Sequence, residues 1–229
     1  MPVFDLAQNS VRDLNASLHR LPQDTNETFW EITNSDGKHA IVAGLDVPVE
    51  VEIKGHVGYY CAGMNKRASV RVHGNAGTGV AENMMSGIVH VMGDVGQSAG
   101  ATGHGGLLIV DGDAAARCGI SMKGIDIIVK GSIGSMSAFM AQAGNLVVFG
   151  DAGDALGDSI YEANIFVRGQ VKSLGADCVE KPMAPDDKAR LADLLDRAGL
   201  GDGIDVDDFR MYGSARRLYH FHIDNVTSY

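Results

Sequence analysis

Seven glycines recur along the chain at a fixed interval of 19 residues, and this spacing limits the fold more than any other sequence feature. In five of the seven repeats a second glycine follows three residues later, whereas Ala115 and Lys172 take that place in the other two. A register held over seven units indicates that each unit is one turn of a solenoid. The repeat glycines are Gly55, Gly74, Gly93, Gly112, Gly131, Gly150 and Gly169.

A short apolar pattern typical of a β-strand precedes each repeat glycine. The residue two places before the glycine is β-branched in every repeat, from Ile53 to Val167, and the residue four places before is always aliphatic. Apolar residues at alternate positions predict a strand with one buried face. The glycine-rich connections are too short for the helix that usually joins parallel strands. We therefore predict an all-β fold, a single-stranded parallel β-helix of seven 19-residue turns over residues 49–179.

Two flanking segments, residues 1–48 and 180–229, are predicted to cover the open ends of the solenoid. The first contains an expected helix from Ser10, its N-cap, to Leu21. The second contains an expected helix that begins at Pro185 and is stopped by Gly199. The remainder, residues 201–229, is interpreted as an ordered tail that lies on the protein or on a partner. The apolar side of the second helix comprises Leu191, Leu194, Leu195 and Ala198.

Charge and cysteine content exclude several classes of function. The net charge is −10 and the isoelectric point is about 5.1, which argues against nucleic acid and anionic membranes as partners. The sequence shows neither a secretory signal pattern nor an apolar stretch long enough to span a bilayer, so we expect a cytoplasmic protein. Cys61, Cys118 and Cys178 form no CxxC pair and are interpreted as small core residues in a reducing compartment.

Three motifs resemble active or binding sites but fit the repeat better. Residues 96–100 match GxSxG, yet that motif requires a strand–turn–helix context, so Ser98 is not expected to be catalytic. The polar residues that follow the repeat glycines could suggest calcium, but calcium β-rolls repeat every nine residues, and turn formation explains them better. They are Asn75, Asp94, Asp113 and Asp151.

The histidines and methionines likewise suggest no metal site. His73 and His90 stand at outward positions of their strands and are expected to face solvent or an interface. Five methionines follow repeat glycines by about ten residues and are expected to fill the core at a second wall. They are Met64, Met84, Met85, Met122 and Met140. We therefore expect no catalytic residue, cofactor or metal in this chain.

The third position before each repeat glycine lies between two inward positions and must face outward. It holds polar residues in the first three turns and apolar ones in the last four. A soluble protein rarely leaves such a stripe in water, so either the chain's own C-terminal helix or a partner protein is expected to cover it. The apolar stripe comprises Ile109, Ile128, Val147 and Phe166.

The glycine ladder resembles the GXGXG domain at the C-terminus of the glutamate synthase large subunit, and also the β-helix subunit of formylmethanofuran dehydrogenase. Residues 74–77, 85–88 and 93–100 carry this resemblance, which covers residues 50–178. Residues 150–178 and 221–225 resemble more closely the glutamate-synthase-type subunit of N-methylglutamate synthase, also called methylamine–glutamate N-methyltransferase. The resemblance implies a right-handed parallel β-helix.

The resemblance also implies a function for the chain as a non-catalytic scaffold. The family's enzyme converts glutamate and methylamine to N-methylglutamate and ammonia. Its other two chains are a glutaminase-domain-like subunit and a synthase-like subunit that carries FMN and iron–sulfur clusters. Alternatives are a subunit of another glutamate-synthase-like amidotransferase complex or of a formylmethanofuran-dehydrogenase-like complex.

Two further alternatives fit the sequence less well. A left-handed β-helix acyltransferase would have 18 residues per turn, made of three hexapeptides, rather than the 19 found here. A purely structural polymer of β-helices would not need the long capping segments at both ends.

Overall fold

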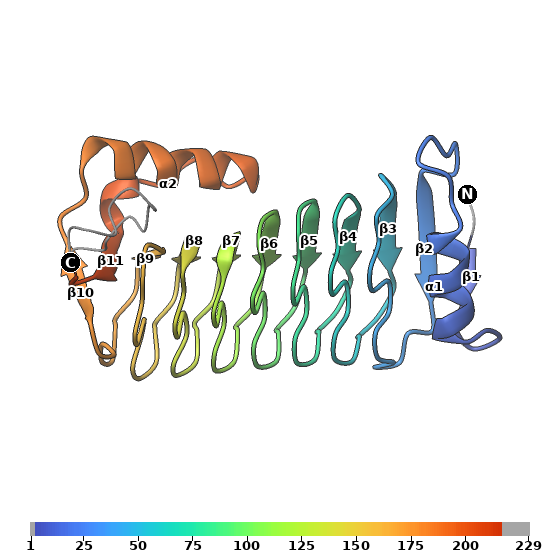
Figure 1. Ribbon diagram of the computed structural model, residues 1–229, viewed down its shortest axis with the longest axis horizontal. Helices are drawn as coiled ribbons and strands as arrows, with labels where there is room; N and C mark the ends of the chain where they lie inside the picture. Colours follow the sequence, from blue (N-terminus) through green and yellow to red (C-terminus); the bar gives the residue numbers. More distant parts are fainter. Residues whose placement is uncertain (1–2, 217–229) are drawn as a thin grey trace, which may run out of the picture.

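The computed structural model describes residues 3–216 and shows a rod with one sheet along its length (Figure 1). The sheet has eleven strands in the order β1-β2-β3-β4-β5-β6-β7-β8-β9-β11-β10. Neighbouring strands from β1 to β9 are parallel, which confirms the predicted parallel β-solenoid. Among the described helices, none is long and apolar enough to cross a membrane.

Short elements alternate with turns along the whole described chain. The N-terminal elements are β1 (Val3–Asp5), α1 (Val11–His19) and β2 (Phe29–Thr33). The strands of the glycine-marked coils are β3 (Glu50–Ile53), β4 (Ser69–Val72), β5 (Ile88–Val91), β6 (Leu107–Val110), β7 (Lys123–Val129), β8 (Ala143–Val148) and β9 (Asn164–Val167). The C-terminal elements are β10 (Cys178–Lys181), α2 (Pro185–Arg197), a 3-10 helix η1 (Val206–Asp208) and β11 (Arg210–Ser214).

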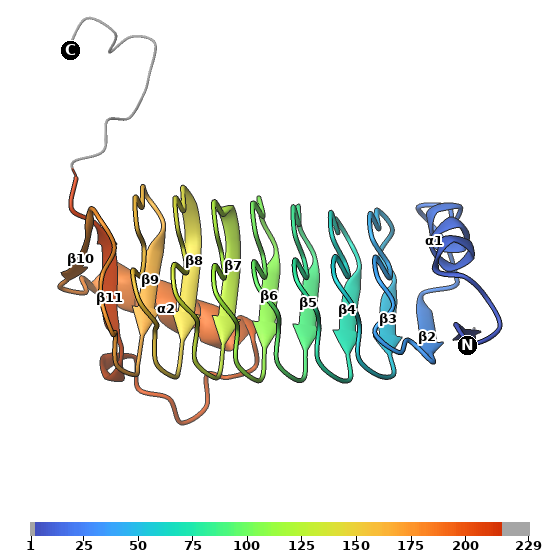
Figure 2. The same ribbon diagram turned by 90° about the horizontal axis from the view of Figure 1, so that it is seen from below.

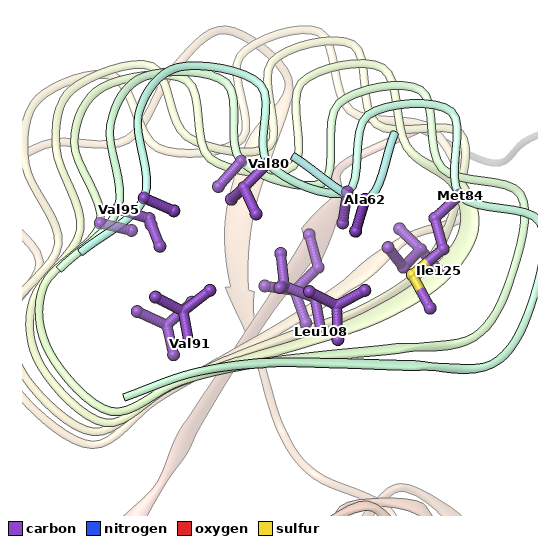
Figure 3. Packing of buried hydrophobic residues seen from close by; sticks show 14 of the residues in the cluster. Ala62, Val80, Met84, Val91, Val95, Leu108 and Ile125 are labelled. Carbon is purple, nitrogen blue, oxygen red and sulfur yellow. The ribbon is translucent and has the colours of Figure 1, made fainter. Parts of the chain in front are cut away.

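The core is a stack of aliphatic side chains enclosed by successive coils. Pairing between neighbouring strands keeps the 19-residue register, so that Val110, Val129 and Val148 are direct neighbours. All three are fully buried. Figure 3 shows the arrangement: Val91 and Leu108 point inward from the sheet, and Ala62 and Val80 face them from the opposite wall. Cys61 and Cys118 are free and buried in this core, where burial raises the pKa of each thiol to about 12.

A row of single bridges forms a second wall just after the glycine corner. It runs through Val57, Ala76, Val95, Ala114, Ile133, Ala152 and Val171, all in parallel pairing. Beyond it, alternate residues adopt left-handed backbone angles; in one coil these are Tyr60 (φ 63°), Ala62 (φ 52°) and Met64 (φ 57°). Left-handed angles are unfavourable for residues other than glycine. Here hydrogen bonds to the flanking coils hold them, including Met64 N–H to Glu82 O at 2.7 Å and Ala62 N–H to Ile41 O at 3.0 Å.

The repeat glycines are required because the corners of successive coils approach each other closely. A Cβ atom on Gly131 would lie 2.6 Å from the carbonyl oxygen of Gly112 and would also overlap the Asp113 carboxylate. Similarly, a Cβ atom on Gly74 would lie 2.9 Å from the carbonyl carbon of Gly55. Neither Gly74 nor Gly131 has a positive φ, so close approach rather than unusual backbone angles selects glycine at both positions.

The polar residues beside the repeat glycines form a ladder between coils. From His56 to Asp151, the side chain of each accepts a hydrogen bond from the backbone N–H of the residue 19 positions later, as in Asp113 N–H to Asp94 Oδ1 at 2.9 Å. The ladder runs through His56, Asn75, Asp94, Asp113, Ser132, Asp151 and Gln170. These residues therefore stabilise turns, as predicted, but they do so by linking one coil to the next.

The solenoid begins one coil before the first repeat glycine. Strand β2 pairs in parallel with β3, with Ile32 beside Ile53, although 21 residues rather than 19 separate them. Helix α1 then closes the end, with Ser10 as its N-cap as predicted. The side-chain amide of Asn15 donates to Ala40 O at 2.8 Å and accepts from Val42 N–H at 3.0 Å, which satisfies backbone groups that lack a preceding coil.

The C-terminal end is closed by a change of strand direction. Strand β11 is antiparallel to both β9 and β10 and lies between them, so the parallel stack stops there. Part of the predicted tail is thus a sheet strand. Residues 217–229, which include the stretch 221–225, lie outside the described residues.

The expectation that all five methionines fill the core was wrong for three of them. Met84 and Met122 are fully buried, but Met64, Met85 and Met140 are more than two-fifths exposed. In this wall a shift of one or two residues along the chain moves a side chain from the interior to the surface.

We predict that Gly131→Ala lowers the free energy of unfolding by about 1–3 kcal/mol, because the new methyl group overlaps the coil below. Chemical denaturation monitored by circular dichroism measures this. The matched control is Gly213→Ala in β11, where the nearest atom is a flexible lysine side chain 3.5 Å from the added Cβ. Equal stability of the two variants would show that the corner does not require glycine.

Candidate partner-binding face of the sheet

Helix α2 divides the outer face of the sheet into a part that it covers and a part that no other segment of residues 3–216 covers, called the uncovered part below. It runs along the rod above the last strands of the stack (Figures 1 and 2). The apolar stripe lies beneath it: Ile128, Val147 and Phe166 are fully buried and Ile109 is 6% exposed. The stripe is therefore covered by the chain's own helix, the first of the two predicted covers, and not by a partner protein.

The packing under α2 is a second apolar core, separate from the interior of the solenoid. Leu191, Leu194 and Leu195 supply the helix side of this core, and Phe209 and Met211 close it near β11. The rings of Phe149 and Phe209 meet edge to face, with centroids 5.3 Å apart. At the C-terminal end of α2, Arg197 Nη1 lies 2.9 Å from Asp126 Oδ2 and ties the helix to β7.

On the uncovered part of the face, a charged network lies over β3 and β4. The Glu52 carboxylate forms ion pairs with Lys54 Nζ at 3.3 Å and with Arg71 Nη1 at 2.9 Å, and it also contacts His73 Nε2. Burial raises the pKa of Glu52, but the hydrogen bonds from His73 and Lys54 and the charge of Arg71 outweigh it, so the pKa falls below its usual value. The carboxylate is therefore ionised at neutral pH.

A second network marks the border with the covered part. The Asp111 carboxylate oxygen Oδ1 lies 2.7 Å from Lys130 Nζ and 3.0 Å from His90 Nε2. Burial raises the pKa of Asp111, but the contacts with Lys130 and His90 outweigh it and hold the pKa below its usual value. As predicted, His73 and His90 point outward, and each contacts a carboxylate.

Two exposed apolar side chains stand between these networks. Ile88 is the first residue of β5 and Met92 directly follows the strand, so that they lie on either side of His90. Their side chains are 41% and 47% exposed. The neighbouring strand pairs Leu107 with Ile88 and Ile109 with His90, and both Leu107 and Ile109 are buried beside α2. The uncovered face thus has an apolar centre and charged margins.

The other residues considered from the sequence are not brought together into a second site. Ser98 has a left-handed backbone (φ 61°) within a turn, and no helix follows it as a nucleophile elbow requires. Residues 3–216 contain no group of three or more histidine, cysteine or acidic side chains placed to hold a metal ion. A shallow groove of about 440 Å³ runs over the glycine corner at Ser132, Asp151 and Gln170.

The chain resembles a known protein in sequence and a solved structure in fold. No protein-family model matches the sequence. The chain is 60% identical over 229 residues to protein GlxC of Rhizobium meliloti (strain 1021), covering 100% of each chain. A chain of the formyltransferase/hydrolase complex (FhcABCD) from Methylorubrum extorquens, solved in complex with methylofuran, is similar in structure, with a TM-score of 0.54. The likeness covers 68% of this chain and 69% of that one at 24% identity, so it shows the fold alone.

We predict that Ile128→Asp destabilises the isolated chain by several kcal/mol, because it places an unpaired carboxylate under α2. The C-terminal region should also become sensitive to limited proteolysis, which mass spectrometry of the fragments would detect. The control is Ile88→Asp on the uncovered face, which should melt like the wild type. An Ile128→Asp variant that melts normally and resists protease would contradict the packing of α2.

Proposed function

The chain belongs to the GlxC family, and from that premise we propose that it is the non-catalytic scaffold subunit of N-methylglutamate synthase. That enzyme converts glutamate and methylamine to N-methylglutamate and ammonia. The observation that carries the proposal is the glycine-cornered parallel β-solenoid, whose strings at residues 74–77, 85–88 and 93–100 resemble the GXGXG domain of glutamate synthase.

The mechanical properties of the rod support a scaffolding role. Successive coils are joined by strand pairing on one wall, by single bridges on a second and by the polar ladder at the corner between them. Bending the rod would stretch at least one of these three sets of hydrogen bonds. A solenoid of this kind holds two bound subunits at a fixed separation, which would help to contain ammonia or methylamine between two active sites.

The proposed partners supply the chemistry. One is a glutaminase-domain-like subunit, and the other is a synthase-like subunit that binds FMN and iron–sulfur clusters. This chain contributes position and orientation, and both effects act on rate through the geometry of the reacting groups.

The fold likeness to a chain of the FhcABCD complex favours one alternative. The chain would then be the β-helix subunit of a complex that transfers or hydrolyses formyl groups, or of a formylmethanofuran-dehydrogenase-like complex. The two proposals differ in the partners that copurify with the native chain: flavoprotein and amidotransferase-like subunits for the first, formyl-transferring subunits for the second.

We predict that the purified chain is colourless and turns over nothing alone. Mixing it with the glutaminase-like and FMN-containing subunits should restore N-methylglutamate formation from glutamate and methylamine, measured by mass spectrometry. The two other subunits without this chain are the control and should show little activity. Stoichiometric flavin on the isolated chain, or full activity in its absence, would refute the proposal.

A further inference from the structure

We propose that the uncovered outer face of β3 to β5 binds a helix of a partner protein that carries apolar side chains along one side and carboxylates beside them. This inference rests on the proposed scaffold function and adds which surface a partner uses and what chemistry that partner presents.

Apolar surface on the sheet continues beyond the part that the chain's own helix covers. Under α2 and the segment that follows it, Leu107 and Ile109 are buried. One strand further on, Ile88 and Met92 occupy the same outer face and remain 41% and 47% exposed. An apolar centre with arginine and histidine at its margin is the usual composition of a protein–protein interface.

The same outer face of the sheet already packs against a helix of this chain. Helix α2 lies along the rod on the same side of the sheet and packs three leucines against it (Figure 2). The strands keep one register across the border, with Arg71 beside His90 and His90 beside Ile109. The surface that supports α2 therefore continues onto β5, β4 and β3. At ~4.8 Å per strand, these three strands span about 10 Å, or roughly two helical turns.

The exposed charges over β3 and β4 suit a partner that carries carboxylates. In the Glu52 network the cations reach solvent while the carboxylate lies beneath them: the side chains of Arg71 and Glu52 are 51% and 15% exposed. Lys54 is likewise more exposed than Glu52. Glu50, at the start of β3, is an exposed carboxylate at the margin of this face. The charged margin over β3 and β4 thus exposes the cations Lys54 and Arg71 in a chain of net charge −10, which favours a partner segment with carboxylates at matching positions.

A binding measurement with matched variants tests the proposal. The probes are the purified glutaminase-like subunit and the purified FMN-containing synthase-like subunit, each titrated against the full-length chain by biolayer interferometry. The test variants are Met92→Asp and Arg71→Glu. The control is Met64→Asp, since Met64 is 46% exposed and follows Ala62 by two residues. Figure 3 shows Ala62 on the wall opposite the sheet. Melting temperatures of all isolated variants establish that each one folds.

We expect Met92→Asp and Arg71→Glu each to weaken binding of one probe at least tenfold, while Met64→Asp binds both like the wild type. If the wild type binds and both test variants bind equally well, the face is not the docking surface, although the scaffold function stands. If the wild type binds neither probe, the scaffold function fails and this inference fails with it. If sedimentation shows that the wild type self-associates and Met92→Asp does not, a second copy occupies the face and the proposal of a partner helix is wrong.

Discussion

The close approach of glycine corners in successive coils is the constraint on which the rest of the structure depends. At each corner the backbone of one coil rests on the backbone of the next, with no room for a Cβ atom at Gly131 or Gly74. This contact fixes the register between coils, so that each residue lies beside the residue 19 positions later and equivalent residues form columns along the rod. Fixed columns in turn align the aliphatic core, the row of single bridges and the polar ladder. Glycine therefore recurs every 19 residues because each coil needs it at this corner contact.

Much of the fold could be predicted because the same local pattern recurs seven times. The strands, the inward column that contains Val129 and the second helix all follow from periodicity. The left-handed segment could not be predicted, because residues such as Ala62 and Met64 have no local preference for it and only hydrogen bonds to neighbouring coils hold it. The methionine positions were misassigned for the same reason, since side-chain direction in that segment does not follow strand alternation.

The candidate site was predictable only in part. The break in the outward column between His90 and Ile109 is visible in the sequence, and it marks where the chain's own cover ends. The networks around Glu52 and Asp111 join residues from different coils, as does the insertion of β11 between β9 and β10. Such contacts depend on how the coils are aligned in three dimensions. The spacing of residues along the chain does not show this alignment. A rod with one face partly covered by its own helix and partly open is well suited to holding a partner at a defined position.

As the proposed scaffold, this chain would join two other subunits into one enzyme. Sedimentation velocity of the chain with the glutaminase-like and FMN-containing subunits, together and in pairs, tests it most directly. We expect one ternary species that contains all three chains, and no complex of the two other subunits when this chain is omitted. A stable complex of those two subunits without the chain, or mutually exclusive binding of the two to it, would contradict the proposed scaffold function.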